Sequence, residues 1–145
     1  MIGRIGFLVI VAIFSRVHAI GQKMDSLDNF VYVEKLPEYP GGEDQLFKFV
    51  RENLEYPAHS FHKRIEGKVI TEFIIDTLGD VTNVKIIKGV NAEIDQEAER
   101  IIKQMGRWNA GSQGGQKVRV LFRLPILFKI DRYTKRKFKL KKLDQ

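Results

Sequence analysis

The chain has 145 residues, enough for one domain with one modest hydrophobic core. It contains no cysteine, which excludes disulfide bonds, cysteine-based metal sites, thiol nucleophiles and a lipid-modified N-terminal cysteine. The formal net charge of +7 is distributed unevenly, because residues 129–145 carry eight basic and only two acidic side chains, so the basic character belongs to a tail and not to a domain face.

The first 19 residues predict a cleaved signal peptide. Arg4 gives a short positive start, residues 5–14 form an apolar run, and Val-His-Ala at residues 17–19 fits a small-x-small cleavage pattern. As a helix, the apolar run would be roughly 15 Å long, about half the thickness of a hydrocarbon core. We therefore expect cleavage after Ala19. The alternative is an uncleaved membrane anchor, which would place Arg16 inside the membrane at a cost of roughly 2.5 to 3.5 kcal/mol.

Residues 20–37 predict an irregular lead segment, and a short helix is expected to begin at Gly41-Gly42. Two acidic side chains stand at the start of this helix, and apolar residues follow at helical spacing. The helix should end near Asn53, because Tyr56 precedes Pro57 and is pushed toward an extended backbone.

Residues 68–76 and 81–88 predict the two strands of a hairpin. The second strand alternates less strictly than the first, because Ile87 breaks the period. The more apolar face of the first strand holds Val69, Thr71, Phe73 and Ile75.

Residues 93–105 predict a helix that lies across the sheet. Its acidic residues suit the N-terminal dipole and the solvent face, and none is expected to be buried. Its apolar stripe consists of Ile94, Ala98, Ile101, Ile102 and Met105.

Trp108 follows that helix and is expected to fill the corner before a final strand over residues 116–128. Pro125 lacks an N–H, so this strand should lie at an edge of the sheet. The predicted fold is α+β and has two layers: an antiparallel three-stranded sheet packed by one helix, with an additional N-terminal helix.

Several short motifs stand in a regular order and spacing along the chain: Tyr56-Pro57, Arg64-Ile65-Glu66-Gly67-Lys68-Val69, Gly79-Asp80-Val81, Asn83-Val84, Arg107-Trp108, Gly111 and Val118-Arg119-Val120. Together they resemble the C-terminal domain of the TonB energy-transducer family. The resemblance covers residues 38–130, and residues 37–43 resemble the lead-in found in members from Bacteroidetes-type bacteria. One departure is Ala110, where the family usually has proline two residues after the tryptophan.

The resemblance implies a periplasmic protein that takes part in energised transport and is not an enzyme. Its partner would be an outer-membrane transporter, which offers an extended N-terminal segment that adds as a strand to the last strand of the domain. Tyr56 and Pro57 would be neighbouring contacts. The residues expected to pair with the partner are Lys117, Val118, Arg119, Val120, Leu121, Phe122 and Arg123.

Three other readings remain open at this point. The edge strand could simply cap the sheet or pair in a homodimer. The basic tail, residues 131–145, is expected to be disordered, but it could bind an anionic envelope surface. His59 and His62 could belong to an enzyme, yet two such residues without a third ligand fit solvated surface histidines better. No nucleic-acid partner, metal or cofactor is expected.

Overall fold

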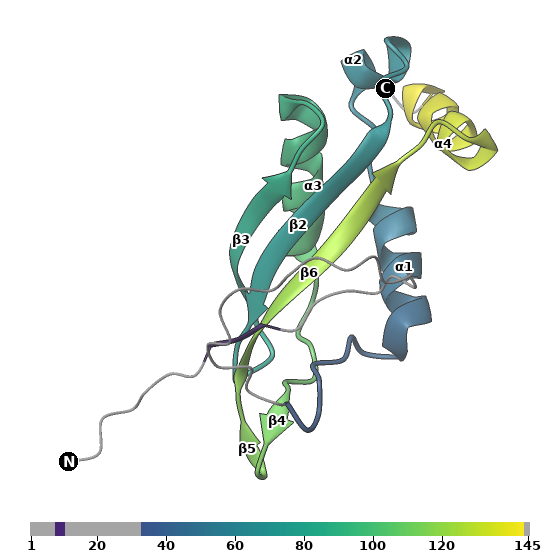
Figure 1. The fold of residues 1–145 in the computed structure, drawn as a ribbon. Helices are drawn as coiled ribbons and strands as arrows, with labels where there is room; N and C mark the ends of the chain where they lie inside the picture. Colours follow the sequence, from purple (N-terminus) through teal and green to yellow (C-terminus); the bar gives the residue numbers. More distant parts are fainter. Residues whose placement is uncertain (1–7, 11–32, 144–145) are drawn as a thin grey trace, which may run out of the picture.

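The computed structural model describes residues 8–10 and 33–143, whose arrangement is drawn in Figure 1. The elements in chain order are β1 (Leu8–Ile10), α1 (Gly42–Asn53), α2 (Ala58–His62), β2 (Gly67–Ile75), β3 (Val81–Lys88), α3 (Ala92–Gln104), β4 (Ser112–Gln113), β5 (Gln116–Lys117), β6 (Arg119–Phe128) and α4 (Arg132–Leu143).

Strands β6, β2 and β3 form an antiparallel sheet with β2 in the centre, and α3 covers one face of it (Figure 1). The ladder between β2 and β6 is regular over nine pairs, from Gly67 opposite Phe128 to Ile75 opposite Val120. With α1 as the additional N-terminal helix, this arrangement confirms the predicted α+β fold.

The core lies between α3 and the sheet, and it contains the residues that the sequence assigns to it. All four residues of the predicted apolar face of β2 are fully buried, and so are four of the five residues in the stripe of α3. Asn91 caps α3, because its side chain accepts a hydrogen bond from the N–H of Ile94 at 2.9 Å. Truncating one large core side chain to alanine would cost about 2 to 5 kcal/mol.

The corner after α3 is filled by Trp108, as predicted. This side chain is 4% exposed, and its ring lies between those of Tyr39, Phe73 and Phe122. The main-chain N–H of Trp108 donates to the carbonyl of Gly79 at 2.8 Å. The corner is therefore joined directly to the turn between β2 and β3.

The prediction of one continuous strand over residues 116–128 is wrong at its start. Gly114 and Gly115 both have positive φ, and their turn folds β5 back onto β4. Val118 lies between β5 and β6 and donates its N–H to the carbonyl of Gly111 at 3.0 Å. Only Arg119–Phe128 continues as β6.

The tail that was expected to be disordered forms α4 from Arg132 to Leu143. Asp131 stands just before this helix and accepts a hydrogen bond from the N–H of Thr134 at 2.8 Å. Tertiary contacts then hold the helix: Phe138 stacks on Phe61, with ring centroids 3.9 Å apart and planes 11° apart. The expectation of disorder failed because it considered the charge of this segment and not these contacts.

Most of the predicted signal peptide lies outside the described residues. Its described part, β1, is a strand that pairs in parallel with β6. Within residues 8–10 and 33–143, no helix is both long enough and apolar enough to cross a membrane.

Candidate functional site

The candidate site is the side of β6 that faces away from β2. Part of this side is covered by β1, whose residues Leu8–Ile10 pair in order with Arg119–Leu121 of β6. In the described part of the chain, no other strand pairs with this side of β6, which is therefore unpaired from Phe122 to Phe128. Unpaired N–H and C=O groups of this kind can hydrogen-bond an added strand.

The sequence predicted a free edge at the N-terminal part of this strand, and that prediction is wrong for Arg119–Leu121 in the full chain. There the chain's own β1 occupies the outer side of β6. The three paired residues of β1 fall within the range that predicts a cleaved signal peptide. Cleavage after Ala19 would remove β1 and leave this part of the edge unpaired.

The predicted pairing residues fall into two groups. Lys117 belongs to β5, where it pairs with Ser112, and Val118 uses its N–H on Gly111, so these two residues are not part of the open edge. The other five lie on β6 and alternate between its faces. Val120 and Phe122 are buried toward the core, whereas Arg119, Leu121 and Arg123 are wholly or partly exposed.

The Arg123 side chain is already engaged within the sheet. Arg123 lies directly opposite Glu72 in the ladder, and its Nε donates to Glu72 Oε2 at 2.7 Å. The charge of this arginine is therefore balanced, so an added strand would contact β6 here mainly through main-chain groups.

Strand β3 forms the opposite edge of the sheet and is a poorer template. Its ladder with β2 shifts register twice, and Asn83 has a left-handed backbone with φ of 52°. Lys85 and Lys88 are exposed along it. Bulges, lysines and prolines are devices by which proteins blunt a strand edge. Between Phe122 and Leu127, β6 has no bulge and no lysine, and Pro125 removes one main-chain donor from it.

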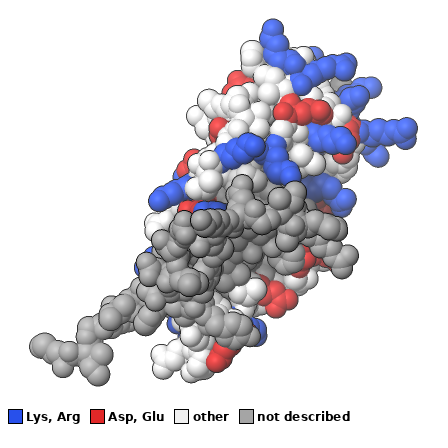
Figure 2. Space-filling model, viewed as in Figure 1, with Lys and Arg blue, Asp and Glu red and all other residues white. Residues whose placement is uncertain are grey.

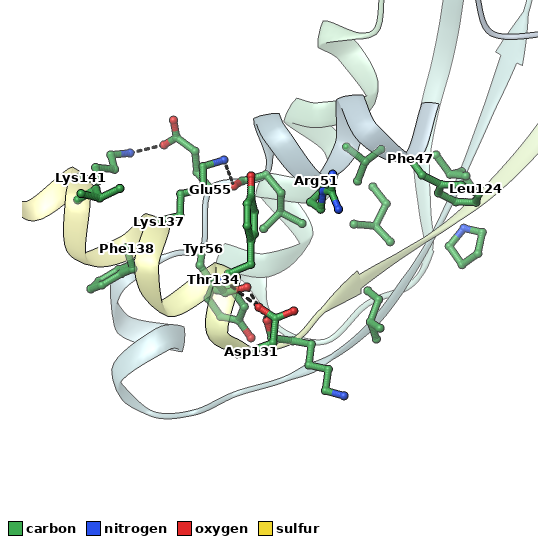
Figure 3. Close-up of a pocket in the computed structure, with 18 residues that line it drawn as sticks. Phe47, Arg51, Glu55, Tyr56, Leu124, Asp131, Thr134, Lys137, Phe138 and Lys141 are labelled. Carbon is green, nitrogen blue, oxygen red and sulfur yellow. Dashed lines mark hydrogen bonds and ion pairs between the residues drawn. The ribbon is translucent and has the colours of Figure 1, made fainter. Parts of the chain in front are cut away.

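A groove of about 630 Å³ runs along β6 beyond the segment that β1 covers (Figure 3). Four consecutive residues of β6 line it, from Leu124 to Leu127. Their side chains alternate between the two faces of the sheet, so the groove follows the edge of the strand and not one face. Its walls come from α1 and α4, with Phe47, Leu127 and Tyr133 as exposed apolar side chains.

Two of the cationic side chains that line this groove, Arg51 and Lys137, are held by local contacts. Arg51 lies over the ring of Tyr133, 5.6 Å from its centroid. Lys137 donates to the carbonyls of Glu52 and Leu54, the latter at 2.9 Å, at the end of α1. Removal from water lowers the pKa of Lys137. The groove is therefore an apolar channel with cations fixed at its rim.

Tyr56 and Pro57 lie at the other end of β6 from the predicted pairing segment. The ring of Tyr56 packs edge-on against Phe128, and its hydroxyl donates to the carbonyl of Ile65 at 2.6 Å. Phe128 lies five positions after Arg123, which is about 17 Å along the strand. Burial raises the pKa of Tyr56 to about 12, with a smaller effect from the charge of Glu66. Tyr56 is thus a buried anchor for this end of the strand.

Pro57 lines a second pocket, of about 700 Å³, between the α1–α2 link, α3 and α4. Glu97 also lines it, and its burial shows that the expectation of no buried acidic residue on this helix was wrong. Glu97 is 8% exposed and receives hydrogen bonds from the N–H of Glu55 and from the guanidinium of Arg100. These bonds tie α3 to the end of α1, which is a structural role.

The two histidines that the sequence singled out lie on α2 and are not brought into a ligand cluster. The ring of His62 meets the edges of Phe61 and Phe138. In residues 33–143, no three histidine, aspartate or glutamate side chains are close enough to hold a metal ion together.

The groove was missed from the sequence because one wall of it is α4. The signals for that helix are present: Asp131 precedes it as a cap, and Thr134, Lys137, Phe138 and Lys141 recur at helical spacing on the side that contacts the domain. The pairing of β1 had no such signal, since its residues fit an apolar signal sequence equally well.

Comparison with known proteins agrees with this architecture. A family model described as the Gram-negative bacterial TonB protein C-terminal matches residues 52–130, more than half of the chain. Protein TonB of Salmonella typhimurium is 33% identical over 75 residues, which are 51% of this chain and 31% of that protein. Protein TonB of Xanthomonas campestris pv. campestris is 31% identical over 78 residues, 53% of this chain and 34% of that protein. The match thus spans about a third of these relatives.

Two solution structures also resemble the chain. The TonB-CTD of Helicobacter pylori has a TM-score of 0.48 at 22% identity, over 64% of this chain and 88% of that one. The Pseudomonas aeruginosa TonB CTD has a TM-score of 0.45 at 24% identity, over 54% of this chain and 79% of that one. By the match to the family model, the chain belongs to the TonB C-terminal domain family.

Proposed function

We propose that this domain acts in the periplasm, in support of energised transport, by binding an extended segment of an outer-membrane transporter. The segment adds as a strand to the outer side of β6, with main-chain hydrogen bonds as the main source of affinity. The observation that carries this proposal is the difference between the two edges of the sheet. The edge at β3 is blunted by register shifts and lysines, whereas β6 offers a regular edge beside an apolar groove.

The pairing of β1 supports this mode of binding. An extended segment already lies against β6 at Arg119–Leu121, so the backbone of this strand can accept a further strand on its outer side. A transporter segment would continue from this position toward Phe128, where the groove offers space for its apolar side chains. In the proposed complex, the segment pairs within residues 119–128, and the predicted Lys117 and Val118 lie just outside it.

The proposal is tested by titrating the protein with a peptide from the N-terminal periplasmic segment of a transporter, while backbone amide signals are recorded. Two forms are compared, the full chain and a form that begins at Ile20. We expect the amides of residues 119–128 to shift in both forms, and the shorter form to bind more tightly because β1 no longer competes. The amides of β3 serve as the internal control, since that strand is the other edge of the sheet.

A second peptide separates strand pairing from side-chain recognition. It has the same sequence, but alternate main-chain nitrogens are methylated, so it keeps its side chains and loses half of its donors. We expect this peptide to lose most of its affinity. Strand addition would be the wrong mechanism if the methylated peptide bound equally well, or if β3 responded while β6 did not. A homodimer through β6 would appear instead as concentration-dependent sedimentation without any peptide.

A further inference from the structure

Helix α4 has two different sides. The side that contacts the domain carries Thr134, Lys137 and Phe138, which are all partly buried. The rest of its surface carries five exposed basic residues, of which Lys142 stands at the rim of the second pocket: Arg132, Lys135, Arg136, Lys139 and Lys142. In total, α4 has seven basic side chains and no acidic one.

Contacts on the inner side fix the direction of these charges. Lys137 binds the last carbonyls of α1, Phe138 stacks on Phe61, and Lys141 pairs with Glu55. The helix therefore cannot turn about its axis without breaking all three contacts. Five positive charges are held on one exposed surface, which we call the outer face of α4 (Figure 2, where blue atoms gather at the α4 end of the molecule).

The outer face lacks partners within the described part of the protein. Two acidic residues close to α4 are already engaged, since Asp131 caps the helix and Glu55 pairs with Lys141 on the inner side. None of the five outer cations forms an ion pair with a described acidic residue. Like charges at this density repel one another and are stabilised by an external anionic surface.

Two exposed leucines distinguish a lipid surface from other polyanions. Leu140 is 53% exposed and Leu143 is 73% exposed. Leu143 lies one helical turn after Lys139 on the outer face, and Leu140 lies one turn after Arg136 at the border between that face and the groove, which it also lines. Apolar side chains among lysines suit the boundary between headgroups and acyl chains, where both groups are satisfied. A soluble polyanion would gain nothing from the leucines.

We propose that the outer face of α4 binds the surface of an anionic phospholipid leaflet. The helix lies in the plane of the headgroups, its cations meet lipid phosphates, and Leu140 and Leu143 enter the top of the acyl region. This interaction does not use the outer side of β6, and it holds the domain at a membrane surface independently of any transporter segment.

The test is sedimentation of the full chain with vesicles of phosphatidylcholine, with or without 30% phosphatidylglycerol. We expect binding only to the anionic vesicles, and we expect it to weaken as salt is raised from about 0.05 to 0.5 M. The triple variant Lys135→Gln, Arg136→Gln, Lys139→Gln should lower the partition coefficient on the order of 100-fold, because each cation near such a surface contributes about fivefold.

A matched control removes the same amount of charge elsewhere. Lys48→Gln, Lys85→Gln and Lys88→Gln also remove three exposed positive charges, but none of them lies on α4. This control should bind anionic vesicles within about threefold of the original chain. Equal losses in the two triple variants would overturn the proposal, because binding would then depend on net charge and not on the outer face.

The double variant Leu140→Ser, Leu143→Ser tests the choice of a leaflet. We expect vesicle binding to fall about tenfold, while binding to soluble dextran sulfate stays unchanged. If the leucine variant bound vesicles as well as the original chain did, the outer face would be a site for a polyanion and not for a leaflet. Thermal unfolding and far-UV circular dichroism establish that each variant keeps its fold.

Discussion

At the scale of single residues, the turn between β2 and β3 depends on Gly79. Its φ is +89°, and a Cβ at this position would lie 1.9 Å from the carbonyl oxygen of Trp108. Asp76 organises the same turn, because its carboxylate accepts the N–H groups of Leu78 and Asp80 at 2.8 and 2.9 Å. The turn and the tryptophan corner are thus built against each other.

We predict that Gly79→Ala destabilises the domain by about 3 kcal/mol or more, as measured by urea unfolding. The substitution combines backbone strain with a clash against main-chain atoms that cannot move aside. Gly114→Ala is the matched control: its φ is also positive, at +55°, but nothing lies within 4 Å of the added Cβ. This control should cost only about 1 kcal/mol. Similar losses in both variants would show that the close approach to Trp108 does not matter.

Tyr56 gives a residue-scale prediction about pH. Its folded pKa is raised to about 12 from an ordinary value of 10.0, so folding favours the protonated phenol. The resulting stability is fully present below pH 10 and is lost as the pH rises from 10 to 12. We expect Tyr56→Phe to remove this contribution of about 2 kcal/mol from the pH profile of unfolding. Absorbance at 295 nm checks the assignment directly, since the tyrosine that ionises at the highest pH should be missing from the titration curve of this variant.

At the scale of elements, α4 is held against the C-terminal end of α1 by one lysine. The Lys137 ammonium reaches the carbonyls of Glu52 and Leu54, where α1 ends and its main-chain acceptors lack helical partners. A lysine at a helix C-terminus also interacts favourably with the helix dipole. The C-terminal helix is thereby fastened to the N-terminal one.

We predict that Lys137→Met loosens α4 without unfolding the sheet. The methionine keeps the apolar stem but cannot donate to either carbonyl, so the contact should weaken by about 1 to 2 kcal/mol. Hydrogen exchange of the α4 amides should accelerate about tenfold, while that of β2 stays the same. Lys135→Met, on the exposed outer face, is the control and should leave exchange unchanged. Equal acceleration in both variants would mean that the two carbonyl contacts do not hold the helix.

The sequence predicted the elements whose pattern is local and regular. The alternation in β2 and the stripe of α3 each define one buried face, and both faces are buried in the structure. Even the irregularity at Ile87 had a structural meaning: Ile70 pairs with Lys88 and Thr71 with Ile86, so Ile87 is the extra residue of a bulge.

The elements that sequence reasoning missed depend on distant contacts. A segment as basic as α4 predicts solvent exposure unless its partners are known, and these include the end of α1 and Phe61, more than 70 residues earlier in the chain. The burial of Tyr56 and its hydrogen bond to Ile65 could not be read from its motif, and its contact with a partner stays a prediction. The edge character of the last strand was predictable from Pro125, whereas its partial cover by β1 was not.

At the scale of the whole molecule, the two proposed surfaces lie at different places. Segment pairing is centred on the outer side of β6, whereas the outer face of α4 projects from the far end of that strand (Figure 1). Arg119 and Phe128 are nine residues apart, which is about 30 Å along an extended strand. A segment that pairs along all of β6 reaches the groove that α4 borders, but none of the five outer cations of α4 lines that groove.

We therefore predict that the domain binds a transporter segment and an anionic vesicle at the same time. The affinity for the segment, measured by fluorescence anisotropy, should stay within about threefold whether or not vesicles are present. The variant Lys135→Gln, Arg136→Gln, Lys139→Gln should lose the vesicles and keep the segment. The prediction would be wrong if the segment and the vesicle excluded each other. The groove beside Leu124–Leu127 has α4 as one wall, which gives a route for such competition. A segment that fills this groove could displace the helix, and α4 would then couple the two surfaces instead of separating them.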